Sequence, residues 1–216
     1  MQQFWLRKEG NRDLILYMLG WAATPNAINH ICPAGYDVLA VCNYTDIHPL
    51  TAEELGEYRR IYLFAWSFGV WVSEQACRHL PLYKAIALNG TPYPVDDRYG
   101  MRLRVVLRTM RSLARNGGSN PAAESQDAER YMPDGPYPDR DPLDKITELE
   151  NLAAWSKEHP TIGLKWDKAY IADKDEIFPP ANMRAYWEPL GLGTPIPGYH
   201  YPFHNPDIVL RELEED

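Results

Sequence analysis

Residues 61–71 read Ile-Tyr-Leu-Phe-Ala-Trp-Ser-Phe-Gly-Val-Trp, and this stretch decides how the rest of the chain is interpreted. The apolar run before Ala65 predicts a strand buried on both faces, and residues 70–80 predict a helix. Between them, residues 66–69 form a sharp turn. With Ala65 in place of the first glycine, residues 65–69 match the five-residue nucleophile elbow Gly-x-Ser-x-Gly. Such a serine needs small neighbours because strand and helix approach closely there. The alternative is a serine that caps an ordinary helix.

The bulk composition fits one globular domain. The 216 residues suffice for a single domain with a substantial core and one insertion. No apolar run approaches the length of a membrane span, and residues 1–5 lack a secretory pattern, which predicts a cytoplasmic protein. The cysteines Cys32, Cys42 and Cys77 have no C-x-x-C spacing, so we expect buried thiols. The net charge of −8 argues against general nucleic-acid binding.

The chain alternates strands with helices up to Gly90, which predicts βα repeats and a mainly parallel sheet. Strands are expected at residues 2–8, 13–19, 36–44, 61–64, 83–88 and 167–172. Helices are expected at residues 26–32, 52–60, 70–80, 101–115, 141–157, 182–187 and 206–214. No linker separates two independent domains, so residues 1–216 are interpreted as one.

Residues 92–160 interrupt this alternation. Two predicted helices with a loop over 116–141 between them, inserted between core strands, suggest a cap over the serine. The first helix has an arginine stripe at spacings i, i+4, i+7 and i+11, which places the side chains on one face. The stripe consists of Arg104, Arg108, Arg111 and Arg115. A neighbouring apolar stripe consists of Leu103, Leu107, Met110 and Ala114. The alternative for the arginines is an ordinary solvated helix face.

A serine nucleophile needs an adjacent base, and the base needs an orienting acid. In α/β-hydrolases these residues follow in the order Ser, acid, His. Asp175 is the preferred acid because it follows a late strand and precedes Glu-Ile-Phe-Pro; Asp173 and Glu176 are the fallbacks. His200 is the preferred base because it lies in a Gly- and Pro-rich turn before the last helix, and His204 is second.

The sequence was also searched for an oxyanion hole and for a metal site. In α/β-hydrolases, one backbone N–H of the oxyanion hole comes from a strand-to-loop junction, and the other comes from the residue after the nucleophile. The candidates here are the N–H of Trp21, which follows Gly20, and the N–H of Phe68, which follows the serine. A metal site at His200 and His204 is rejected, because Pro202 interrupts any helix there and no third ligand is evident.

Five motifs together resemble the BioG-type pimeloyl-ACP methyl ester esterases of the α/β-hydrolase superfamily, where ACP is acyl-carrier protein. They are residues 19–21 (Leu-Gly-Trp), 66–69 (Trp-Ser-Phe-Gly), 89–92 (Asn-Gly-Thr-Pro), 175–182 (Asp-Glu-Ile-Phe-Pro-Pro-Ala-Asn) and 200–203 (His-Tyr-Pro-Phe). They follow the same order at a similar chain length. The departures are Ala65 and the loop over 116–141.

The resemblance implies the α/β-hydrolase fold and an esterase that demethylates pimeloyl-ACP methyl ester in biotin synthesis. It implies Ser67 as nucleophile, His200 as base, Asp175 as orienting acid, and no metal or redox cofactor. It also implies a small acidic partner, acyl-carrier protein, which a chain of charge −8 would repel without a local basic surface such as the arginine stripe. A general carboxylesterase or thioesterase, and a non-catalytic carrier-binding protein, remain the alternatives.

Overall fold

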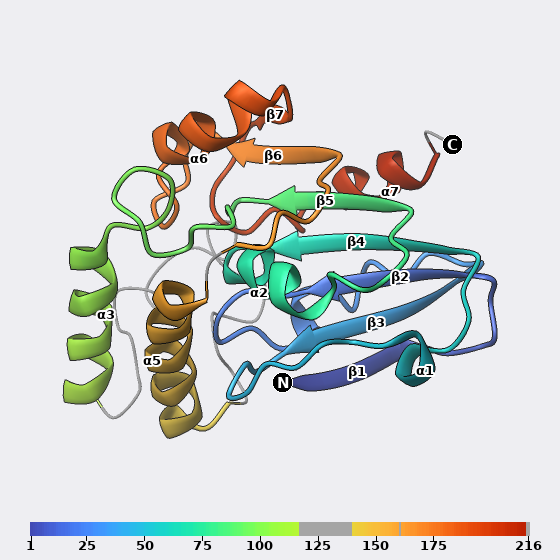
Figure 1. Cartoon of the computed structure of the whole chain (residues 1–216), viewed down its shortest axis with the longest axis horizontal. Coiled ribbons are helices and arrows are strands. Elements are labelled where there is room, and N and C mark those ends of the chain that lie inside the picture. Colours follow the sequence, from blue (N-terminus) through green and yellow to red (C-terminus); the bar gives the residue numbers. More distant parts are fainter. Residues whose placement is uncertain (117–139, 160, 215–216) are drawn as a thin grey trace.

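The described part of the chain forms one seven-stranded sheet with helices packed against both faces (Figure 1). The computed structural model describes residues 1–116, 140–159 and 161–214. The spatial order of the strands is β1-β3-β2-β4-β5-β6-β7. They are β1 (Gln2–Arg7), β2 (Asp13–Met18), β3 (Tyr36–Cys42), β4 (Arg60–Trp66), β5 (Lys84–Leu88), β6 (Lys168–Ala172) and β7 (Gly193–Ile196). β1 is antiparallel to β3, and the other described pairs are parallel, so the predicted mainly parallel sheet is confirmed.

The order of the strands creates a switch point beside β2. The chain runs from β2 outward to β3 and then crosses back past β2 to form β4. The loops that leave β2 and β4 therefore diverge at the carboxyl edge of the sheet. In open α/β sheets, ligands bind in the crevice at such a point. The loop with Trp21 follows β2, and Ser67 follows β4.

The central strands are apolar on both faces because both faces are covered. In β2, Leu14, Leu16 and Met18 point into one core cluster, and Ile15 and Tyr17 point into the other. Residues that alternate in this way belong to opposite faces of a strand. The continuous apolar runs of the sequence are thus explained by burial on two sides.

Helices contribute apolar residues to both core clusters. They are α1 (Ala52–Leu55), α2 (Phe68–Ala76), α3 (Leu103–Arg115), α5 (Pro142–Glu158), α6 (Pro180–Trp187) and α7 (Asp207–Glu214), with 3-10 helices at Pro25–Ala27 and Glu188–Leu190. The first core cluster contains apolar residues of α2, α5 and α6, and the second contains those of α7. α2 begins directly after Ser67, and its apolar residues lie in the first core cluster. The helix that follows the elbow therefore covers one face of the sheet.

Several predicted boundaries were wrong. In place of the helix expected over 26–32 there is the 3-10 turn Pro25–Ala27, and the helix expected over 52–60 is the single turn Ala52–Leu55. Gly56 ends that turn with φ 101°, a conformation that glycine adopts without steric cost. The helix after the elbow ends at Ala76, before residue 80. β7 was not predicted, because a segment with Pro195 has little strand character.

The helices α3 and α5 lie beyond the carboxyl ends of the parallel strands, at the left of Figure 1. α3 packs on α5. Asp141 caps α5 as predicted, by accepting a hydrogen bond from the N–H of Leu143, with Pro142 at the first helical position. Most of the predicted loop over 116–141 lies outside the described residues. In the described part of the chain, no helix has the length and apolarity needed to cross a membrane.

The structure shows which face of α3 is buried, which the sequence alone does not decide. Val106 and Leu113 are the buried residues of the helix, and Met110 packs partly against the core. Leu103 and Leu107 are exposed. Of the apolar stripe at 103, 107, 110 and 114, only Met110 thus packs against the core. Periodicity identifies a helix but cannot choose between two adjacent apolar stripes.

Candidate active site

Ser67 lies in a strained turn between β4 and α2. Its backbone has φ 60° and ψ −125°, in a region that non-glycine residues rarely occupy. Its N–H donates to the carbonyl of Leu88 on the neighbouring strand at 3.0 Å. Its side chain makes no capping hydrogen bond to α2, so the alternative of an ordinary capping serine fails. The hydroxyl is instead available to a partner outside the helix.

The close approach of strand and helix at the elbow requires residues without side chains. A Cβ atom at Gly69 would lie 2.1 Å from the carbonyl oxygen of Met18, and one at Gly90 would lie 2.4 Å from that of Ser67. Real Cβ atoms do not approach a backbone oxygen so closely, so both positions require glycine. Ala65, at the position of the usual first glycine, is fully buried and lies beside Met18 and Ala87 in the sheet. One methyl group therefore fits there.

Ser67, His200 and Asp175 form a continuous chain of hydrogen bonds. The Oγ of Ser67 lies 2.9 Å from Nε2 of His200, and Nδ1 of His200 lies 2.8 Å from Oδ2 of Asp175. An ionised carboxylate can only accept, so Nδ1 carries the proton and Nε2 is free to accept from the serine hydroxyl. This is the arrangement in which an imidazole can act as a base toward a serine.

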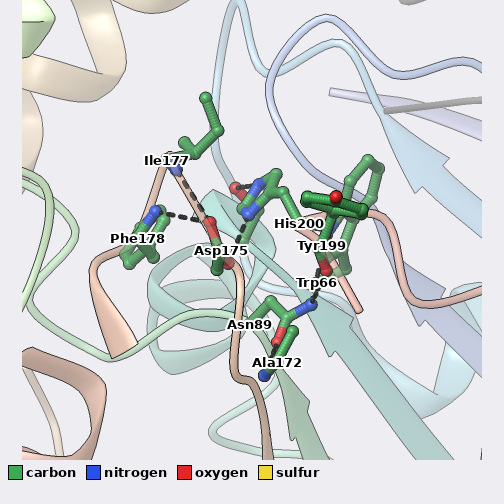
Figure 2. Close-up of polar contacts among 9 residues, drawn as sticks. Trp66, Asn89, Ala172, Asp175, Ile177, Phe178, Tyr199 and His200 are labelled. Carbon is green, nitrogen blue, oxygen red and sulfur yellow. Dashed lines mark hydrogen bonds and ion pairs between the residues drawn. The ribbon is translucent and has the colours of Figure 1, made fainter. Parts of the chain in front are cut away.

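Asp175 is held rigidly by its own loop. Its Oδ1 accepts the N–H groups of Ile177 and Phe178 at 2.8 and 2.9 Å, which leaves Oδ2 for His200 (Figure 2). Asp173 is exposed, and its carboxylate accepts the N–H of Gly198. Glu176 is exposed. Of the three candidate acids, Asp175 alone is hydrogen-bonded to His200 within the described residues.

The backbone and ring of His200 are fixed from several sides. The carbonyl of His200 accepts from the indole of Trp66 at 2.8 Å and from the amide of Asn89 at 2.9 Å. Phe178 stacks on the imidazole with an interplanar angle of 3°. His204, the second candidate base, faces elsewhere, with Nδ1 3.0 Å from the carbonyl of Tyr201. The imidazole therefore has little freedom to leave Ser67.

Asn89 is a site residue whose role was not foreseen. Its Nδ2 donates to the carbonyls of Tyr199 and His200, and its Oδ1 accepts the N–H of Ala172 (Figure 2). It thus ties the loop with the imidazole to the strand that precedes the acid. The signal was a polar residue at the end of a buried strand, but its partners lie more than 80 residues away.

The two expected oxyanion donors flank the serine. Phe68 is the first residue of α2, where N–H groups have no acceptor within the helix. Trp21 follows Gly20, and a Cβ atom at Gly20 would lie 3.1 Å from that of Ser67. The loop with Trp21 therefore passes directly beside the serine. Trp21 and Phe68 are therefore both near Ser67, as a pair of oxyanion donors would have to be.

The arginine stripe lies on the surface of α3. Arg104, Arg108, Arg111 and Arg115 are all exposed, as is the large apolar side chain of Leu107. The stripe thus offers four positive charges on a chain whose net charge is −8. Among the described residues, no three His, Cys, Asp or Glu side chains are grouped so that they could hold a metal ion.

Comparison with known proteins gives concordant results. A family model described as "Pimeloyl-ACP methyl esterase BioG" matches residues 1–207. A Haemophilus influenzae protein recorded as uncharacterized is 36% identical over 197 residues, which cover 88% of this chain and 89% of that protein. A Bacteroides fragilis protein named malonyl-acyl-carrier-protein O-methyltransferase is 31% identical over 193 residues, which cover 85% of this chain but 37% of that protein.

Solved structures agree with these matches. The crystal structure of selenomethionine-labelled BioG from Haemophilus influenzae has a TM-score of 0.81 at 30% identity, and the match covers 94% of this chain and 95% of that one. A lipase-esterase related protein from Clostridium acetobutylicum has a TM-score of 0.63 at 13% identity, with 99% and 98% covered. The second likeness concerns the fold alone, and the expected α/β-hydrolase fold is confirmed.

Proposed function

The chain belongs to the BioG family of pimeloyl-ACP methyl esterases, and we propose that it removes the methyl group from a pimeloyl chain carried by acyl-carrier protein. It is an esterase of the α/β-hydrolase fold. The observation that carries the proposal is the hydrogen-bonded chain from Ser67 through His200 to Asp175 at a strained elbow. It supports Ser67 as nucleophile, His200 as base and Asp175 as orienting acid.

The proposed reaction has two steps. His200 accepts the hydroxyl proton while the Oγ of Ser67 attacks the ester carbonyl, and the carbonyl electron pair moves to an oxygen that faces the N–H groups of Trp21 and Phe68. The imidazolium then donates its proton to the leaving methoxide, and methanol departs from an acyl-enzyme. In the second step His200 deprotonates a water molecule, which attacks the acyl carbon. The serine is restored, and the new carboxyl group is released.

Asp175 contributes to both steps through His200. Its Oδ2 holds the proton-bearing Nδ1, which keeps Nε2 directed at the serine. The negative carboxylate also stabilises the imidazolium that forms during each attack. Because its other oxygen is held by two backbone N–H groups, the carboxylate brings this charge without losing its orientation.

The proposal of a carrier-bound substrate has two supports beyond the family. The exposed arginines of α3 offer a local positive surface to an acidic carrier. The relative named as a malonyl-acyl-carrier-protein O-methyltransferase contains a segment related to this chain. A transferase that makes a methyl ester on a carrier-bound acyl group supplies the kind of bond that this esterase would cleave.

Methanol release tests the proposal. We expect the purified protein to release methanol from methyl pimeloyl-ACP with a much higher kcat/KM than from a free methyl ester of the same chain length. Equal kcat/KM values for the two substrates would favour the alternative, a general carboxylesterase or thioesterase on small acyl substrates. Failure of Ser67 to react with a serine-directed phosphonate would favour a non-catalytic carrier-binding protein.

A further inference from the structure

Glu148 on α5 is a fully buried carboxylate that accepts hydrogen bonds from two loops far away in the chain. Its Oε2 accepts the backbone N–H of Ala22 at 3.0 Å, and its Oε1 accepts that of Tyr44 at 2.7 Å. Arg140 also donates to Oε2 at 2.6 Å. Ala22 follows β2 and Tyr44 follows β3, so one side chain of α5 fixes the ends of two neighbouring strands. α5 lies beside these strand ends in Figure 1.

The same helix also holds the residue that precedes Ala22. The indole N–H of Trp21 donates to the carbonyl of Lys145 at 2.8 Å, about one turn before Glu148 on α5. Trp21 is thus anchored to α5 through its side chain and through the next peptide group. Ala22 has φ 59°, a left-handed conformation that alanine rarely adopts, and such backbone persists only where its surroundings enforce it.

We propose that Glu148 is a positioning residue of the oxyanion hole. By fixing the N–H of Ala22, it holds the backbone at Trp21 so that the N–H of Trp21 points at the oxygen on which negative charge develops. This inference rests on the proposed role of Trp21 as an oxyanion donor. A donor must be aimed before the reaction, since reorientation during the reaction forfeits most of its benefit.

The charge of Glu148 does not oppose this role, because it is paired. Arg140 neutralises the carboxylate, and its second nitrogen donates to the side chain of Asn43 at 2.6 Å. Burial raises the pKa of Glu148, and the positive charge of Arg140 and the two backbone N–H groups oppose that rise. A carboxylate without this partner would repel the developing oxyanion.

Two variants and one control test the proposal. Glu148→Gln keeps the shape but replaces one accepting oxygen with a donor, and Glu148→Asp keeps the charge but shortens the reach. Glu150→Gln makes the same charge change at an exposed position of α5. The substrate is a short carrier-free ester, so the result does not depend on whether the natural substrate is carrier-bound. Thermal unfolding shows whether each variant is folded at the assay temperature.

An inhibitor separates positioning from general damage. With a trifluoromethyl ketone, the serine oxygen bonds to the ketone carbon, the carbonyl electron pair moves to oxygen, and the hydroxyl proton passes to His200. The oxyanion of this adduct needs the same donors as the transition state. We expect kcat to fall by about 10-fold or more in both Glu148 variants, with KM within about twofold, and the inhibitor affinity to fall by a similar factor. Glu150→Gln should match the wild type.

Three results would overturn the proposal. A folded Glu148 variant with wild-type kcat and wild-type inhibitor affinity would show that the carboxylate does not aim the donor. A fall in kcat without a fall in inhibitor affinity would place the effect outside the oxyanion hole. Loss of folded protein in both variants would identify Glu148 as a purely structural anchor. If the short ester gives the expected pattern but methyl pimeloyl-ACP is not cleaved, the substrate proposal alone fails.

Discussion

The loops at the carboxyl ends of the strands and the outer surface of α3 differ in how far their polar side chains are buried and held by hydrogen bonds. In the loops, Ser67, Asp175 and His200 are each less than 10% exposed, and each has several fixed hydrogen-bond partners. On α3, the four arginines are exposed. Bond-making requires atoms held within fractions of an ångström, whereas attraction of a charged partner requires only that charges face solvent. The first region should therefore govern every substrate, and the second only substrates with a charged carrier.

The strongest test of this contrast removes the proposed nucleophile or the proposed base. Ser67→Ala deletes the oxygen proposed to attack the ester and adds no bulk, and His200→Ala deletes the proposed proton acceptor. We expect each to lower kcat by about 10⁶-fold on the carrier-bound ester and on a free ester alike, because such residues act as a unit. Methanol release under single-turnover conditions measures this. Substantial activity in either variant would mean that the reacting residue has been misidentified.

A smaller effect is expected at the acid. Asp175→Asn keeps the shape but loses the charge that orients and stabilises the imidazolium, so kcat should fall by up to about 10⁴-fold on both substrates. Asp173→Asn is the matched control two residues earlier, where the carboxylate serves only Gly198 among the described contacts. The two kcat values are compared on the same ester. If Asp173→Asn had the larger effect, the acid would have been misassigned by two positions.

The smallest effect should be confined to one substrate. In Arg104→Glu with Arg111→Glu, two exposed charges on α3 are reversed, and neither residue belongs to the proposed catalytic machinery. Each exposed ion pair is worth about 0.2–1 kcal/mol, so kcat/KM for the carrier-bound ester should fall by about 2- to 30-fold. Its dependence on ionic strength should also become weaker, because fewer attractive charges remain to be screened.

Hydrolysis of a free ester is the internal control for the double reversal, and it should stay unchanged. Equal losses on both substrates would mean that the substitutions had disturbed the packing of α3 on α5. No loss on either would leave the arginine stripe as a solvated helix face, and the carrier would have to dock on another surface.

Local chemistry explains what could be predicted from the sequence. The elbow is encoded within a dozen residues, because a buried apolar run, a serine and Gly69 all lie between residues 61 and 69. The chain order of Ser67, Asp175 and His200 reflects which strands end at the same edge of the sheet. Their hydrogen bonds then follow from the parallel topology, although the distances themselves could come only from the structure.

The residues that could not be predicted act over long separations. Glu148 lies 126 residues from Ala22, and Asn89 lies 111 residues from the carbonyl that it holds on His200. No local pattern distinguishes Glu148 from the exposed acids of the same helix, since only the folded chain shows which one is buried. The sequence does not decide the buried face of α3 for a similar reason, because only the folded chain shows that Val106 and Leu113 are buried while Leu107 is exposed.

The left-handed backbone of Ser67 has a consequence for how the chain would evolve. A backbone of φ 60° and ψ −125° costs a serine of the order of 1–3 kcal/mol, whereas glycine adopts it readily. Selection for thermal stability alone would therefore favour replacement of this serine, the proposed nucleophile, by glycine. The elbow would survive in such a lineage as a relaxed turn in an inert protein. Retention of a serine there marks a position where natural selection has opposed the thermodynamic preference of the fold.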